Sequence, residues 1–212
     1  MMAALILREV RRGLTGGAWL PVAFFLLVAA MVPFAVGPDA RLLARIGGGA
    51  LWIAALTAAL LPIERLVEPD RADGILDQMV LRGMPEEAIG AGKIVGHWLS
   101  FGPLLLVAAV PASFLVGLDG DALARCLASL AVGTVALAAL AVAVASLTSG
   151  LPRAGALAGL LLMPLAVPLV IFGAAATGDG ESAALKLEAA VALLTLAGAP
   201  FVSGAAIRAA RT

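Results

Sequence analysis

The residue types that carry most enzyme chemistry are scarce in this chain of 212 residues. It has one histidine, His97, one cysteine, Cys126, and no tyrosine. A zinc site, an iron–sulfur cluster or a disulfide needs several cysteine or histidine ligands, which a single chain of this kind does not supply. The sequence also lacks the G-x-x-x-x-G-K-[ST] loop that holds nucleotide phosphates. We therefore predict no catalytic residues and no metal site.

Charged residues gather in one segment, residues 64–93, which holds 11 of the 28 charged side chains. Within this segment we predict a short amphipathic helix over residues 73–84, with Asp73 as its N-cap. Polar side chains would occupy one arc of this helix, although Leu81 falls on that arc as well. The apolar arc comprises Ala72, Ile75, Leu76, Met79, Val80 and Met84.

Pro85 ends this helix and suits the start of a second one, with Glu86 and Glu87 near its positive end. The second helix would continue through Lys93 into an apolar run. A short helix that projects in this way either lies on lipid headgroups or fits a groove on a partner protein. Its mixture of acids and bases differs from the Lys/Arg-rich face of lipid-binding helices, so we favour the partner.

The rest of the chain is strongly apolar, with 62% hydrophobic residues, 13% charged residues and a mean hydropathy of +1.08. Six stretches without any charge are 26, 18, 25, 27, 25 and 19 residues long. Because a helix needs about 17–25 apolar residues to cross a bilayer, each stretch is long enough to span it once. We predict an all-α integral membrane protein, one domain over residues 1–212, with spans at 18–36, 46–63, 97–117, 126–148, 154–176 and 189–206.

The positions of Lys and Arg predict the orientation of these spans. If the N-terminus is cytoplasmic, the inner segments carry ten of these residues and the outer loops, including the loop at 178–188, carry four. Six spans return the C-terminus to the cytoplasm, and residues 64–93 lie on that side too. Acidic and basic residues are equal in number, so the sequence does not indicate a nucleic acid as partner.

Residues 2–15 have the pattern of a helix that lies on the membrane surface, with apolar side chains on one face and charged ones on the other. The simpler interpretation is a positive flank that anchors the first span. Within the fifth run, Gly155 and Gly159 predict close packing of the GxxxG type. Pro164 and Pro168 in the same run indicate either ordinary bundle packing or a bend that moves.

Four blocks of this sequence resemble, in order, a known family. They are GPDARLLARIGGGALWIAAL at 37–56, ERL…D…DGIL at 64–76, GKIVGHW at 92–98 and GLPRAGALAGLLLMPLAVPLVIF at 150–172. They are similar to the permease subunit of the bacterial cytochrome c maturation haem exporter, the CcmB family, and the likeness runs nearly end to end. The resemblance implies a multi-pass inner-membrane subunit of an ABC transporter of the six-span exporter type, which exports haem to the periplasm for c-type cytochrome biogenesis.

The resemblance also implies the partners of this chain. They would be an ABC ATPase dimer, a second copy of the chain, a haem-handling membrane subunit, a small single-span subunit and membrane lipids. ATP would be bound and hydrolysed by the separate ATPase, so the chain itself would not be an enzyme. Haem would be the substrate of the complex and not a cofactor held by this chain.

Candidate site residues follow from the same resemblance. The family's coupling helix, which sits in a cleft of the ATPase, corresponds to residues 73–84. We expect Asp73, Gly74, Ile75, Leu76, Gln78 and Met79 to dock there, with Ile75, Leu76 and Met79 supplying the apolar contact. His97 and Trp98 are candidate haem contacts, although a single histidine near the end of a helix is also typical of a packed or interfacial residue.

Two other functions stay open at this stage. The chain could be a structural subunit that couples an ATPase to a haem-handling partner without transporting anything, or an ABC permease for another substrate. An ion-coupled carrier is disfavoured because carboxylates are not expected well inside the spans. At the inner boundary, Arg65 is expected to pair with Glu68 one turn later.

Overall fold

The computed structural model describes residues 1–17, 19–178 and 182–211, and the regular secondary structure within these ranges is helical. The predicted span start at residue 18 and part of the predicted outer loop at 178–188 lie outside the described residues. The long helices are α1 (Met2–Thr15), α2 (Trp19–Val36), α3 (Ala40–Leu60), α6 (Glu86–Leu115), α7 (Gly120–Thr148), α8 (Ala154–Ala176) and α9 (Ser182–Ala209). The short elements are a 3-10 turn, η1 (Ile63–Arg65), and helices α4 (Glu68–Ala72) and α5 (Ile75–Leu81).

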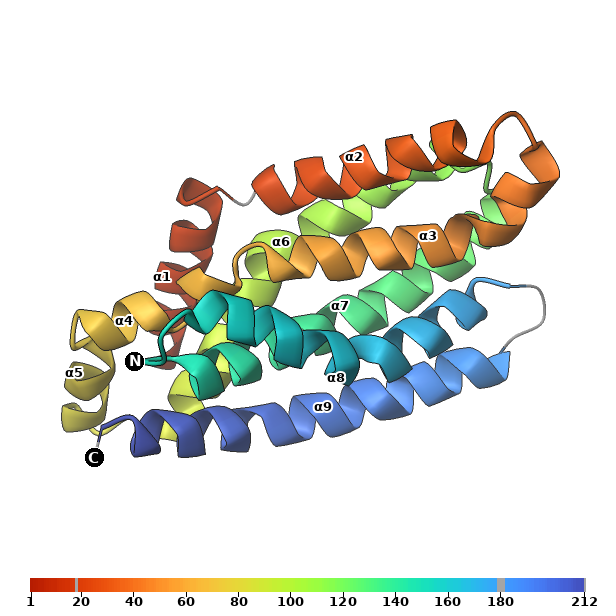
Figure 1. Ribbon diagram of the computed structural model, residues 1–212. Helices are drawn as coiled ribbons and strands as arrows, with labels where there is room; N and C mark the ends of the chain where they lie inside the picture. The colour runs from red at the N-terminus through yellow and green to blue at the C-terminus, as the bar shows by residue number, and fades with distance from the viewer. Residues whose placement is uncertain (18, 179–181, 212) are drawn as a thin grey trace.

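Six of the described helices, α2, α3, α6, α7, α8 and α9, are long and apolar enough to cross a membrane. They lie side by side as a bundle, with α1, α4, α5 and both termini at one end (Figure 1). Long apolar runs become helices because a bilayer offers no water to the backbone, and a helix satisfies its N–H and C=O groups internally. The predicted all-α membrane fold is confirmed.

Helix α6 begins at Glu86, directly after Pro85, where the sequence predicts a helix that continues into the third span at 97–117. Pro85 precedes it with extended backbone, and the helix runs for 30 residues without a break. At about 1.5 Å per residue it is about 45 Å long, whereas the bilayer core is about 30 Å thick. Its first turns therefore extend beyond the core, toward the end of the bundle that carries α4 and α5.

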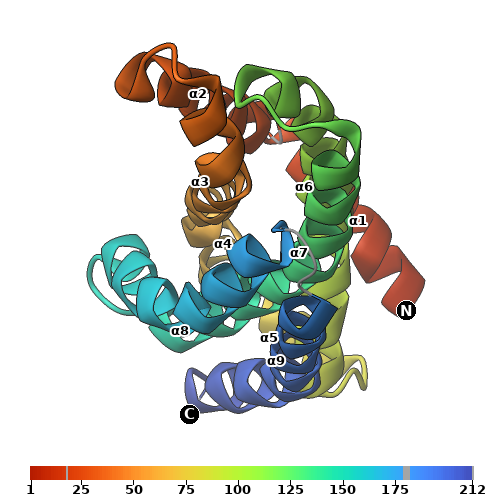
Figure 2. The ribbon, with the colours of Figure 1, turned by 90° about the vertical axis from the view of Figure 1, so that its right-hand side faces the viewer.

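Helix α7 lies in the middle of the bundle, packed against α3, α6, α8 and α9 (Figure 2). Small residues such as Ala136, Ala138 and Ala139 are fully buried on it and let neighbouring backbones approach closely. Many large apolar side chains lie on the outside, among them Phe34 and Phe114, although Trp52 and Phe25 are fully buried. An outer surface rich in large apolar side chains is the one expected of a bundle surrounded by lipid.

Helix α1 crosses the bundle end and packs along α6, so it is more than a charged flank (Figure 1). The crossing depends on Gly92 and Gly96 of α6, which lie directly beneath Leu5 and Glu9. A Cβ atom at Gly92 would lie 2.6 Å from Leu5 Cδ2. The two glycines, one helical turn apart, therefore form the surface on which α1 rests.

Helix α8 contains Pro164 and Pro168, for which the sequence left two interpretations, ordinary bundle packing or a bend that moves. It continues from Ala154 to Ala176 as one helix, through both Pro164 and Pro168. Gly155 lies against the side chain of Glu64 in η1, whereas a Cβ atom at Gly159 would meet nothing within 4 Å. The predicted GxxxG contact between two long helices is therefore wrong for this glycine pair.

Candidate functional site

The segment between α3 and α6 forms two short helices, α4 and α5. Helix α5 lies within residues 73–84, where the sequence predicts an amphipathic helix, and α4 precedes that range. Gly74 separates them with a left-handed φ of 66°, a conformation that glycine adopts at little cost. Asp73 follows α4, and its backbone N–H donates to the carbonyl of Pro69 at 2.9 Å. The prediction that Asp73 caps the amphipathic helix is therefore wrong, because its side chain makes no cap hydrogen bond to α5.

The apolar arc of α5 faces the protein itself. Leu76 is 3% exposed and packs in a cluster of buried side chains from several helices. Ile75 and Met79 are half-buried beside a shallow cavity that residues of α1 also line. These three side chains, predicted to contact a partner, are thus turned partly or wholly toward their own subunit.

The opposite face of α5 is exposed, as is Asp73 just before the helix. Among the predicted docking residues, Asp73 and Gln78 are exposed, and Gln78 also borders the cavity beside α1. Gly74 is half-buried between α4 and α5. Leu81 lies on the exposed face of α5 and is 82% exposed. In the sequence, the exposure of Leu81 was indicated by its position on the polar arc of the predicted helix.

A cluster of charged side chains connects α4 to α1 and α6. Asp70 on α4 is fully buried and forms ion pairs with Lys93 of α6 and with Arg8 and Arg12 of α1. The Arg12 Nη1 to Asp70 Oδ1 distance is 2.8 Å. Lys93 Nζ also donates to the carbonyl of Leu66 at 2.8 Å. Buried charges require such partners, so this cluster fixes how the three elements meet.

Glu9 completes this group, which we name the interfacial ion cluster: Arg8, Glu9, Arg12, Asp70 and Lys93. Glu9 Oε1 accepts from Arg8 Nη2 at 2.6 Å and from Lys93 Nζ at 3.4 Å. Burial by itself would lower the pKa of Arg8, but the hydrogen bond to Glu9 and the negative charge of Asp70 raise it above its ordinary value. With three cations and two carboxylates, the cluster carries an excess of positive charge.

The end of α9 contacts α5 and the start of α6. Arg211 Nε lies 2.5 Å from Asp77 Oδ1, and Arg211 Nη1 lies 3.0 Å from Glu86 Oε1. Arg208 Nη2 lies 2.7 Å from Glu87 Oε1. Exposed ion pairs of this kind add little to stability, but they link the C-terminal helix to the projecting segment.

Two pairings at the inner boundary differ from the predicted one. Glu68 accepts from Arg71 Nη2 at 2.6 Å and from the backbone N–H of Gly150 at 2.7 Å. Arg65 instead donates from Nη1 to the carbonyl of Gly16 at 2.7 Å. The predicted pair of Arg65 with Glu68 is therefore wrong, because the turn η1 directs Arg65 toward the connection between α1 and α2.

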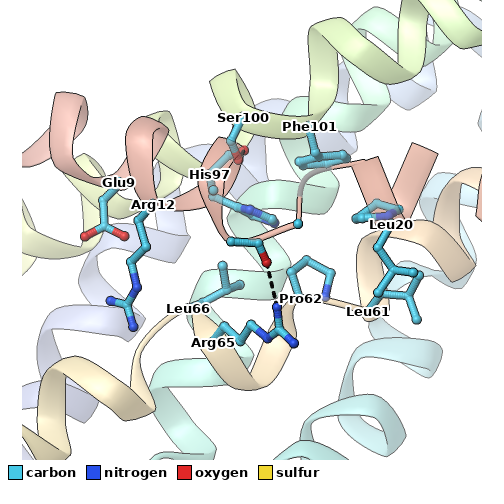
Figure 3. Close-up of a pocket in the computed structure, with 14 residues that line it drawn as sticks. Glu9, Arg12, Leu20, Leu61, Pro62, Arg65, Leu66, His97, Ser100 and Phe101 are labelled. Carbon is cyan, nitrogen blue, oxygen red and sulfur yellow. Dashed lines mark hydrogen bonds between the residues drawn. The ribbon is translucent and has the colours of Figure 1, made fainter. Parts of the chain in front are cut away.

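His97 and Trp98 point to different neighbours. The His97 ring is 6% exposed, stacks on Phe101 with a centroid distance of 4.7 Å, and borders a cavity (Figure 3). Trp98 donates from Nε1 to Thr134 Oγ1 of α7 at 3.1 Å. The two candidate ligand contacts are adjacent in sequence, but the structure does not bring them together at one site.

The sequence predicts no carboxylate well inside the spans, and a buried carboxylate in the bundle contradicts this prediction. Glu188 of α9 is fully buried, and its Oε2 accepts from Ser129 Oγ at 2.8 Å. Trp52 of α3 donates from Nε1 to the same hydroxyl at 2.9 Å. Glu188 lies just outside the predicted sixth span, and the sequence signal for its burial was that Leu185 and Ala192, one turn away on either side, are apolar.

The fold and these contacts define a multi-pass integral membrane protein with six spanning helices and a charged projection at one end of the bundle. Comparison with known sequences then identifies the family. Over residues 1–210 the chain matches the family described as CcmB protein, and it belongs to this family. It is a multi-pass protein of the bacterial inner membrane.

Curated relatives cover nearly the whole chain. Proteins named heme exporter protein B from Paracoccus denitrificans and Rhodobacter capsulatus are 42% and 41% identical to it over 214 residues. Each alignment covers 98% of this chain and 98% of the relative. The protein of the same name from Escherichia coli K12 is 38% identical over 194 residues, which cover 89% of this chain and 88% of that protein.

Proposed function

We propose that this chain is the permease subunit of an ABC transporter that exports haem to the periplasm for c-type cytochrome biogenesis. Membership of the CcmB family carries the proposal, together with the name heme exporter protein B of its relatives. The sequence has no nucleotide phosphate loop of its own, so a separate ATPase dimer would supply the energy.

The ATPase would dock on the exposed face of α5. Leu81 offers an apolar side chain there, flanked by the polar Gln78, whereas Leu76 is already packed within the subunit. Of the residues first expected to dock, Asp73 and Gln78 remain accessible, and Ile75 and Met79 would hold α5 against α1. An apolar anchor that becomes buried on docking, surrounded by a polar rim, is the usual composition of a protein interface.

Movement of the docked segment would reach the spans through two connections. Asp77 on α5 pairs with Arg211 at the end of α9. Asp70 on α4 pairs with Lys93 at the start of α6 and with two arginines of α1. Because α6 and α9 both continue across the bundle, a push on α4 and α5 would tilt both of these spans.

The complex would contain two copies of this chain, because a two-site ATPase requires two membrane halves. A haem-handling membrane subunit and a small single-span subunit would complete it. Of the two candidate haem contacts, His97 alone lines the cavity of Figure 3, which has a volume of about 160 Å³. Pockets that enclose a drug-sized ligand measure about 300–1,000 Å³. We therefore place haem transfer at a surface shared with the other subunits and not inside this cavity.

The test is complementation of a bacterial strain that lacks its own CcmB protein. Expression of this chain should restore covalent haem attachment to periplasmic cytochromes c, measured by haem staining, and should recover the ATPase in a pull-down from detergent. An ATPase variant that does not hydrolyse ATP serves as the negative control. Recovery of the complete complex without restored haem attachment would show that the chain only scaffolds the assembly or carries another substrate.

A further inference from the structure

A cavity of about 160 Å³ lies where three elements meet at the end of the bundle that carries α1. The connection between α1 and α2, the turn after α3 and the middle of α6 form its walls. Figure 3 shows Leu61, Pro62, Arg65 and Leu66 on one side, facing His97, Ser100 and Phe101 on the other. The cavity thus combines apolar walls with two arginines, the carboxylate of Glu9 and an imidazole.

His97 borders this cavity and has one ring nitrogen without a partner in the described part of the chain. Its Nε2 is buried and has no hydrogen-bond partner among the described residues. Buried polar atoms are normally satisfied, and an exception calls for a ligand or another partner. In the neutral tautomer that carries hydrogen on Nε2, the imidazole would donate to an acceptor placed in the cavity.

Arg65 presents a charge that the described residues do not neutralise. Its Nη1 donates to the carbonyl of Gly16, and the ion pairs formed by the described residues do not include it. Arg12, on the other wall, is a member of the interfacial ion cluster, which already has three cations for two carboxylates. Of the charged side chains that line the cavity, Arg12 and Arg65 are cations and Glu9 is a carboxylate, so the lining carries an excess of positive charge that would attract an anion.

The size and depth of the cavity restrict the choice of anion. It adjoins the start of α2, where Trp19 is strongly exposed, and exposed tryptophans are typical of the boundary between headgroups and hydrocarbon. Leu20 and Phe101 provide apolar walls beside the cations. A phosphate-sized group would fit the volume of this cavity. If that group belongs to a phospholipid, the acyl chains of the lipid could lie along the outer surface of α2.

From these observations we propose that the cavity between His97 and Arg65 binds the phosphate of an anionic phospholipid. Arginine recognises phosphate through its fork of N–H donors, and basic pockets between membrane helices are known to hold lipid headgroups. The bound lipid would sit between α1, the turn after α3 and α6, and the interfacial ion cluster also connects α1 with α6. It would hold α1 against the membrane surface.

Native mass spectrometry of the full chain tests this proposal. The protein is released from nanodiscs that contain phosphatidylglycerol or phosphatidylcholine, and the retained lipid molecules are counted. One phosphatidylglycerol should remain bound, and Arg65→Gln should lower its retention about tenfold, as expected when one charge-assisted contact is lost. Arg65→Lys should give an intermediate loss, and His97→Gln should also weaken retention.

Arg11→Gln is the matched control, because Arg11 is exposed on α1 next to Arg12 but does not line the cavity. It removes the same charge at the same surface and should leave retention unchanged. Arg65 is exposed, so its variants should fold normally, which a thermal unfolding scan verifies. Equal retention in all variants, equal loss in Arg11→Gln, or equal retention of phosphatidylcholine would each overturn the proposal.

Discussion

Lys93 and Asp70 are in contact inside the protein, where the side chain of each is 1% exposed. They lie 23 residues apart, on α6 and α4, and neither position stands out in the charge pattern of its segment. Arg8 and Arg12 reach the same carboxylate from α1. One aspartate therefore determines how the surface helix, the projecting segment and a spanning helix are placed relative to one another.

The arrangement predicts unequal effects for the two partners. Asp70→Asn leaves three cations with Glu9 as the one carboxylate of the cluster and should lower the free energy of unfolding by about 3–5 kcal/mol, the usual cost of removing one partner of a buried ion pair. Lys93→Met should cost less, because Asp70 keeps both arginines. Thermal unfolding in detergent measures the difference. A larger loss for Lys93→Met than for Asp70→Asn would contradict the cluster.

Leu81 tests the docking face. Leu81→Asp should leave thermal stability unchanged because the side chain is 82% exposed, yet it should lower recovery of the ATPase about tenfold. Leu81→Met is the matched control and should keep both properties. The double change Ile75→Asp with Met79→Asp should reduce stability as well as recovery, because those side chains face α1. Unchanged recovery with Leu81→Asp would place the docking site elsewhere.

The pair of Asp77 and Arg211 should matter for coupling more than for stability. Asp77→Arg or Arg211→Asp alone should change the free energy of unfolding by less than about 1 kcal/mol, since the pair is exposed. Each should reduce haem attachment in the complemented strain, and the double swap should restore it. Failure of the swap to restore activity, with the ATPase still bound, would show that α9 receives no signal through this contact.

Glu188 should act as a hydrogen-bonding group within the bundle. Glu188→Gln keeps an acceptor for Ser129 Oγ and should change stability by no more than about 1 kcal/mol. Glu188→Ala removes the acceptor and leaves a space, so we expect a loss of about 2–4 kcal/mol. Unfolding in detergent compares the two. Similar large losses for both variants would mean that the negative charge itself is required.

Orientation is tested by labelling single cysteines after Cys126→Ala. A membrane-impermeant thiol reagent added to intact spheroplasts should label Ala40→Cys and Gly120→Cys, at the end opposite α5. It should label Gln78→Cys only after the membrane is opened. All three positions are exposed, so access depends on the side of the membrane and not on packing. Labelling of position 78 in intact spheroplasts would reverse the topology derived from Lys and Arg.

Much of the fold could be predicted from local sequence. Six uncharged runs correspond to α2, α3, α6, α7, α8 and α9, because a bilayer forces each long apolar run to satisfy its own backbone. Pro85 and the acids after it predicted a new helix leading into the third span, and α6 starts there. The amphipathic pattern of residues 2–15 likewise predicted α1. These features depend on neighbours within a few turns, so the sequence by itself determined them.

Tertiary structure decided which face each short element uses. The apolar arc of α5 could equally have met a partner or its own subunit. In the structure it faces its own subunit, where Leu76 belongs to the same buried cluster as Leu5 of α1, and Leu81 is left outside. Asp70 is 62 residues from Arg8, and Glu188 is 59 from Ser129, so their contacts arise only when the helices assemble. Periodicity shows that a helix has an apolar face and a polar face. It does not show what lies opposite, because that depends on the packing of helices distant in sequence.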